Sequence, residues 1–518
     1  YKNGNRIILC MKSILREMDL QKECLLLGGV MKRELKACLE AMKHAESYQA
    51  WSDAAKEYDR LSGNEEWKED DASPHYDYKM IRLRYNELRT ARERGDVNQL
   101  VFFFNEGLHG NLGRIANPML YQQSFFGTKN LVTDYLDEVC ACLRWIAKTE
   151  FPNFSFVQKL EFFERTSQAF GQSGMMLSGG AALGLFHLGV LKAMFDEGLL
   201  PTVISGSSAG SIMASALATH NDEELEQLFD PEYLYLEAFR TIGWRGTLKG
   251  QGILDPAQLE LCLERNVKDM TFEEAFKHSG RKVSITVSPA DPHQESRLLN
   301  ALSSPHVLIR KATLASCAIP YVYPPVMLWA KNIDGEKCPF IPSRQWVDGS
   351  IKNDLPAQRL ARLYGVNHTI VSQTNPHVAP FISQKHKEKK MVGYITDMVI
   401  NNTRYNVSQA FEYLTNKVSN LQLALLLDKA QSIVNQTYVG DVNIVPPRRP
   451  SNIFKLLTNA TPDILAGYIK EGTAATYPKI ESIRNSTMIS RTINECLDQL
   501  KLEEERELQE YSQHHATA

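Results

Sequence analysis

A serine between two glycines carries the sharpest chemical signal in this chain. The segment GSSAG at residues 206–210 directly follows the apolar run 202–205 and precedes the helical run 211–219. Glycines permit a tight strand-to-helix turn that holds a serine in a strained backbone, with its hydroxyl projecting above a sheet. We therefore predict that Ser208 is the nucleophile of an acyl-transfer reaction.

A serine hydroxyl is a poor nucleophile until a base accepts its proton. The best candidate base is Asp348, which follows the apolar pair Trp346 and Val347 and precedes Gly349. An isolated Asp-Gly is usually a plain turn, but one that ends a strand can aim its carboxylate into a site. The pattern makes Asp348 the predicted partner of Ser208.

A second glycine-rich loop, SGGAALG at residues 178–184, also joins a predicted strand to a predicted helix. Acyl transfer needs N–H donors for the oxyanion of its tetrahedral intermediate, and backbone groups at a helix N-terminus provide them. The candidate donors are Gly179, Gly180 and Ala181. A dinucleotide or phosphate loop is the alternative, but the segment lacks the GxGxxG order and no GK[ST] follows it.

These residues need a scaffold that brings distant turns together. Between residues 175 and 375, short apolar runs alternate with helical segments, which predicts a mostly parallel α/β sheet. The predicted strands are 175–177, 203–205, 283–287 and 369–371.

The flanking regions have helical periodicity instead. Apolar residues recur at spacings of three and four from residue 5 to 61, an acid-rich loop is expected at 63–74, and helices resume up to 148. We predict a helical N-terminal domain (1–165), a catalytic α/β domain (166–375) and a helical C-terminal region (376–518).

Composition excludes several classes of protein. The 518 residues are 43% hydrophobic and 23% charged, as in folded globular proteins, and the formal net charge of −3 gives no field to recruit nucleic acid. The nine cysteines and the histidines show no metal-ligand spacing, so no metal is expected. No apolar run approaches the roughly 20 residues of a membrane span.

Taken together, the glycine loop, GxSxG and Asp-Gly occur in the order that is typical of one family. The segments FHLGV at 186–190 and ASCAIP at 315–320 agree with it. The chain therefore resembles the patatin-like phospholipases. This resemblance implies a three-layer α/β/α core, a Ser208–Asp348 dyad in which the aspartate takes the proton directly, and no cofactor.

The resemblance is narrower than the whole family. The block GLHGNLG at 107–113 and GTK at 127–129 is similar to the N-terminal domain of unknown function in triacylglycerol lipases of yeast lipid particles and plant oil bodies. Ser178 and Leu183 depart from the Asp and Arg of many patatins, and the missing arginine favours a neutral glyceride over a phospholipid. The similarity covers roughly residues 45–375, and more weakly extends to 485.

The resemblance implies a triacylglycerol lipase that meets its glycerolipid substrate at a lipid droplet or membrane surface. The expected location is cytoplasmic, with peripheral attachment to that surface, and the helical stretch 414–434 is a candidate for lipid contact. Alternatives are a phospholipase, a lysophospholipid acyltransferase or transacylase using the same dyad, or a non-catalytic lipid-surface scaffold. A Ser-Asp-His triad with His368 or His377 also stays open.

Overall fold

A computed structural model describes residues 31–242, 253–291, 294–320, 322–350, 354–375, 439–447 and 457–516, with side chains up to 510. The chain divides into two compact units. The first comprises Tyr1–Thr90 and Asn111–Val139, and the second comprises Ala91–Gly110 and Cys140–Ala518. All predicted site residues belong to the second unit.

From residue 31 to 170 the described chain is mostly helical, in agreement with the periodicity of residues 31–61 and 75–148, and the predicted helical residues 5–30 lie outside the described residues. Its helices are α2 (Tyr48–Ser62), α3 (Asn64–Glu69), α4 (Tyr78–Glu93), α5 (Val97–Gly107), α6 (Asn130–Lys148) and α7 (Phe156–Phe170), with 3-10 turns η1 (Leu112–Arg114) and η2 (Pro118–Tyr121).

Buried charges organise the first unit. Asp59 has no exposed surface; it pairs with Lys68 Nζ at 3.0 Å and accepts the Phe125 N–H at 3.0 Å. Lys129 is equally buried and donates to the Trp67 carbonyl at 2.6 Å. Since buried charges are costly unless they are paired or hydrogen-bonded, these contacts fix the local chain path. Within the GTK segment at 127–129, Lys129 therefore acts through hydrogen bonds to the backbone of this unit.

The second unit is built on a seven-stranded sheet in the order β4-β3-β2-β1-β8-β9, with β7 paired to β3. The strands are β1 (Gln172–Leu177), β2 (Val203–Gly206), β3 (Lys282–Pro289), β4 (Arg297–Asn300), β7 (Trp346–Asp348), β8 (Val366–Ser372) and β9 (Val442–Ile444). Among the described strands of this sheet, β4 and β7 pair antiparallel with β3, and the other pairs are parallel. A separate hairpin joins β5 (Trp329–Lys331) to β6 (Lys337–Pro339).

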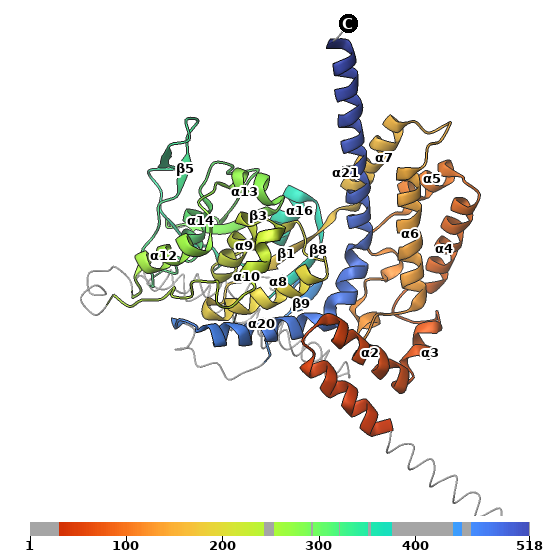
Figure 1. Ribbon diagram of the computed structural model, residues 1–518, viewed down its shortest axis with the longest axis horizontal. Coiled ribbons are helices and arrows are strands. Elements are labelled where there is room, and N and C mark those ends of the chain that lie inside the picture. The colour runs from red at the N-terminus through yellow and green to blue at the C-terminus, as the bar shows by residue number, and fades with distance from the viewer. Residues whose placement is uncertain are drawn as a thin grey trace, which may run out of the picture. The chain divides into compact units, whose positions relative to one another are not determined.

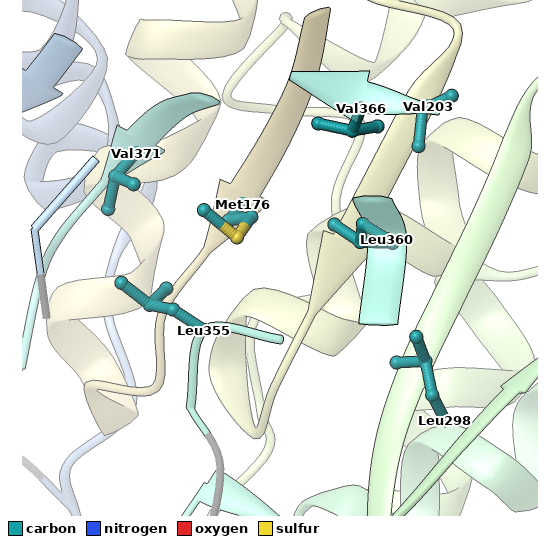
Figure 2. Close-up of a cluster of buried hydrophobic side chains, with 7 residues drawn as sticks. All are labelled: Met176, Val203, Leu298, Leu355, Leu360, Val366 and Val371. Atoms are coloured by element: carbon teal, nitrogen blue, oxygen red, sulfur yellow. The ribbon is translucent and has the colours of Figure 1, made fainter. Parts of the chain in front are cut away.

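Helices cover both faces of this sheet (Figure 1). One face packs on α16 (Ala357–Tyr364) through the apolar cluster in Figure 2, which consists of Met176, Val203, Leu298, Leu355, Leu360, Val366 and Val371. Strand side chains alternate, so positions 204 and 206 face the other side. Helix α9 (Ala209–Thr219) lies on that side. Its first turn approaches the strand so closely that a Cβ on Gly206 would come within 2.3 Å of the Gly210 carbonyl oxygen.

Helices α8 (Phe186–Asp196) and α20 (Pro462–Thr476) touch backbone to backbone. A Cβ on Gly189 would lie 2.1 Å from the Ile469 carbonyl oxygen, and one on Gly472 would lie 2.5 Å from that of Phe186. Any larger residue at either glycine would push the two helices apart. Helix α20 is therefore an integral part of the second unit.

The remaining helices of this unit are α10 (Asp222–Leu228), α12 (Pro256–Asn266), α13 (Phe272–Ser279), α14 (Ile309–Ser316) and α21 (Ile480–Ala516), with 3-10 turns η3 (Ala181–Leu185) and η6 (Tyr477–Lys479). The α/β prediction is confirmed, and each of the four predicted strands lies within β1, β2, β3 or β8. The division at residues 165 and 375 stays a prediction. No helix in the described ranges is long and apolar enough to cross a membrane.

Candidate active site

Ser208 sits in the turn between β2 and α9, with φ of 50° and ψ of −124°. A positive φ is costly for a residue with a side chain and persists only where the surroundings enforce it. The flanking glycines provide that enforcement, because a Cβ on Gly210 would lie 2.2 Å from the Leu177 carbonyl oxygen. The predicted tight turn between a strand and a helix is therefore present, with Ser208 in its strained position, and the role of Ser208 as nucleophile stays a prediction.

Asp348 ends β7, which pairs with β3 and thereby approaches the elbow. Its side chain is 3% exposed; it hydrogen-bonds Ser208, and its Oδ1 accepts the Ser350 N–H at 2.8 Å. Burial raises the pKa of Asp348 to about 6, although the bonds from Ser350 and Ser208 act in the opposite direction. A carboxylate that is harder to ionise is a stronger base, which suits proton transfer from a hydroxyl.

Ser316, at the end of α14, ties these elements together and was not singled out from the sequence for any role. Its Oγ accepts the Ser208 N–H at 3.0 Å and donates to the Thr286 carbonyl of β3 at 2.8 Å. Two residues later, the Ala318 carbonyl accepts the Asp348 N–H at 3.0 Å. The ASCAIP segment thus holds the backbones of both Ser208 and Asp348.

The glycine loop at 178–184 lies against Ser208. A Cβ on Gly179 would be 3.3 Å from Ser208 Cβ. The first hydrogen bond of η3 runs from Leu183 N–H to the Gly180 carbonyl, so the N–H groups of Gly180 and Ala181 precede the bonded turn and have no intrahelical acceptor. The Gly179 N–H instead donates to a carboxylate, Asp354 Oδ1, at 2.8 Å. Gly180 and Ala181 are therefore the better candidates for oxyanion donors.

Asp354 is the second buried acid of the site, and sequence reasoning missed it. Burial, with a further contribution from the nearby Asp348, raises the pKa of Asp354 to about 7, while the bond from Gly179 lowers it. Its only sequence signal is its place six residues after Asp348. An acid among turn-forming residues gives no indication of burial.

His187 supports the glycine loop. Its ring is fully buried, with Nε2 at 2.9 Å from the Ser178 carbonyl and Nδ1 at 2.7 Å from Ser372 Oγ. Nε2 must donate to the carbonyl, so Nδ1 accepts from the hydroxyl. Burial lowers the pKa of His187 to about 4, which keeps the ring neutral. Its N–H is committed to the loop.

The triad alternative finds no support among the described residues. His368 bonds Ser173 Oγ at 2.9 Å, near the start of β1, whereas the glycine loop follows the end of that strand at Leu177. No histidine in the described ranges hydrogen-bonds Ser208 or Asp348. His377 and the stretch 414–434 lie outside the described residues.

An apolar pocket opens beside Ser208, between α8 and α9. Ala181 and Ala209, the latter adjacent to Ser208, line one part of it. Apolar side chains continue the lining, among them Leu188, Leu191, Met213, Leu228, Phe229, Leu236 and Phe239. Such a pocket suits a hydrocarbon chain attached to the reacting carbonyl. Within the described residues, no group of three His, Cys, Asp or Glu side chains is arranged to hold a metal.

Comparison with known families assigns both parts of the chain. Residues 30–168 match a domain of unknown function, DUF3336, and residues 175–361 match the family described as patatin-like phospholipase.

Three curated relatives carry similar names. Triacylglycerol lipase 4 of Saccharomyces cerevisiae is 34% identical over 86% of this chain and 51% of its own length. Triacylglycerol lipase SDP1L of Arabidopsis thaliana is 33% identical over 88% of this chain and 58% of its own length. Triacylglycerol lipase ptl3 of Schizosaccharomyces pombe is 31% identical over 86% and 94%. The chain thus spans about half the length of the first two and nearly all of the third.

Proposed function

Because this chain belongs to the patatin-like phospholipase family, we propose that it hydrolyses carboxylic esters of glycerolipids, with triacylglycerol as its main substrate. The observation that carries the proposal is the hydrogen bond between the buried Asp348 carboxyl and the strained Ser208. The names of the curated relatives support the substrate class.

The proposed reaction has two stages. Asp348 accepts the hydroxyl proton while Ser208 attacks the ester carbonyl, and the N–H groups of Gly180 and Ala181 stabilise the oxyanion. The N-terminus of α9, which begins at Ala209, adds its dipole. The alcohol leaves with the proton from Asp348, and water activated by the same carboxylate then releases the fatty acid.

Two features support a lipid substrate. The apolar pocket beside Ser208 matches an acyl chain, and exposed apolar side chains flank its lining segments: Tyr233 and Ile464 are 49% exposed and Leu457 is 37% exposed. Such a rim would contact the surface from which the substrate enters. We accordingly propose a peripheral position on a lipid droplet or membrane surface, on the cytoplasmic side. Leu183, where an arginine would favour a charged head group, supports a neutral glyceride.

The raised pKa of Asp348 predicts how the rate of ester hydrolysis depends on pH. The carboxylate must be ionised to accept a proton, so the active fraction falls as pH drops through about 6. We expect kcat/KM for a soluble p-nitrophenyl ester to decrease about tenfold per pH unit below that value and to level off above about pH 7. A profile that stays flat down to pH 4 would contradict the assignment of Asp348 as a buried base.

A substrate panel tests the proposed function. Purified protein would be incubated with emulsified triolein, diolein or phosphatidylcholine, and released fatty acid measured, with labelled monoolein present as an acyl acceptor. We expect fatty acid from triolein in preference to phosphatidylcholine, with little label entering diacylglycerol. Dominant transfer to the acceptor would mark a transacylase instead. Absence of reaction with every ester, or fluorophosphonate labelling at a serine other than 208, would contradict the proposal.

A further inference from the structure

Asp354 connects the two loops that meet at the nucleophile. Its side chain is 1% exposed, and its Oδ1 accepts the Gly179 N–H of the glycine loop at 2.8 Å. Its own backbone carbonyl accepts the Ser207 hydroxyl of the elbow at 3.0 Å. These partners are 175 and 147 residues away in the sequence. Asp354 is thus hydrogen-bonded both to the glycine loop and to the turn that carries Ser208.

The other side of Gly179 is fixed as well. Its carbonyl accepts Ser178 Oγ at 3.0 Å and Thr374 Oγ1 at 3.2 Å. In a trans peptide the carbonyl of one residue and the N–H of the next point in opposite directions. The Gly180 N–H is therefore directed away from Thr374. Gly180 also leaves no room for a Cβ against Thr374, whose Oγ1 would be 2.3 Å from it.

Removal of the Asp354 acceptor would free one of these two restraints. The Gly179 N–H would be buried without a partner, and the backbone there could rotate to find one. Because Gly179 carries no side chain, rotation meets little steric resistance. A rotation about the N–Cα bond of Gly179 that no neighbouring torsion compensates turns the Gly179–Gly180 peptide and hence the N–H of Gly180. A small misalignment of an oxyanion donor is sufficient to lose its contribution.

We propose that Asp354 is a positioning residue that sets the orientation of the oxyanion donors by accepting the Gly179 N–H. This inference rests on the proposed function, since it concerns the same site. It assigns Asp354 no contact with substrate. The property required of Asp354 is a hydrogen-bond acceptor at the position of Oδ1, which an asparagine amide oxygen also supplies.

The test compares Asp354→Asn with Asp354→Leu on a soluble p-nitrophenyl ester. We expect Asp354→Leu to lower kcat about 100-fold with KM changed less than about threefold, the pattern of a lost transition-state interaction. Asp354→Asn should stay within about tenfold of wild type. Asp441→Leu is a control with the same change of residue: Asp441, which is exposed, also accepts a distant backbone N–H, from Thr369 at 2.8 Å, but in a strand instead of the loop. It should leave kcat unchanged.

Thermal midpoints would show whether each variant is folded. If Asp354→Leu does not fold, Asp354→Ala removes the same acceptor of the Gly179 N–H without adding bulk, and it should lower kcat to a similar extent at constant KM. Wild-type kcat in folded Asp354→Leu or Asp354→Ala, or an equal loss in the folded Asn variant and the variants without an acceptor, would overturn the inference. Failure of the proposed function looks different, because wild type and Ser208→Ala would then hydrolyse the ester equally.

Discussion

Replacing Ser208 with alanine should reduce the rate of ester hydrolysis by at least about 10⁴-fold. The remaining rate would come from substrate binding and the oxyanion donors alone. Alanine removes only the hydroxyl, so no acyl-enzyme can form, while the buried environment of the elbow changes little. Ester hydrolysis would be followed with a p-nitrophenyl ester and with emulsified triolein, and covalent labelling with a fluorophosphonate. We expect labelling to be lost together with both activities.

Alanine at 208 must also be compatible with the strained φ of 50°. Ala181, in the glycine loop, already has φ of 49°, so a positive φ is compatible with a methyl side chain within the same site. A circular dichroism spectrum and thermal midpoint close to wild type would establish that the fold persists. Residual triolein hydrolysis above a few per cent would place the nucleophile elsewhere.

Replacing Asp348 with asparagine should lower kcat about 10⁴-fold with little change in KM. Asparagine preserves the shape and can still accept the Ser350 N–H, but its amide is not a base. Because a nucleophile and its base act as one unit, the Ser208→Ala, Asp348→Asn double variant should be no slower than Ser208→Ala alone. The rates of wild type, the two single variants and the double variant would be measured on the same soluble p-nitrophenyl ester.

The histidine control separates a dyad from a triad. His368→Gln should retain at least about half of wild-type kcat, because the ring bonds Ser173 at the opposite end of β1. A loss of several orders of magnitude in kcat in this variant would instead support a Ser-Asp-His triad with His368. A loss of less than tenfold in Asp348→Asn would equally exclude Asp348 as the base.

The sequence predicted the parts of the site that have a local signature. Ser208 stands out because the strain of the elbow demands glycines at fixed offsets, and Asp348 because its Asp-Gly follows a short apolar strand. The central strands were equally visible, since fully buried parallel strands form continuous apolar runs. These features need only a few neighbouring residues to be recognised.

Features that depend on distant partners were not visible. Ser316 and Asp354 act through hydrogen bonds that span more than 100 residues, so nothing beside them in sequence marks their role. The short strand β9 lies in a region predicted to be helical and is specified by its pairing with β8. Helix α3 occupies 64–69, within the expected acidic loop; Glu65 and Glu66 fall in its first turn, where negative charge is favourable. That part of the loop prediction is wrong.

The close contact of α8 with α20 changes what counts as the smallest active fragment. The patatin-like match ends at residue 361, before β8, β9 and α20. A protein cut at that boundary would leave β1 with an unpaired edge and the glycine face of α8 uncovered, both of which invite aggregation. It would also lack Ser372 and Thr374, which hold His187 and the glycine loop. A fragment that is expressed to fold and act on its own should therefore extend through at least residue 476.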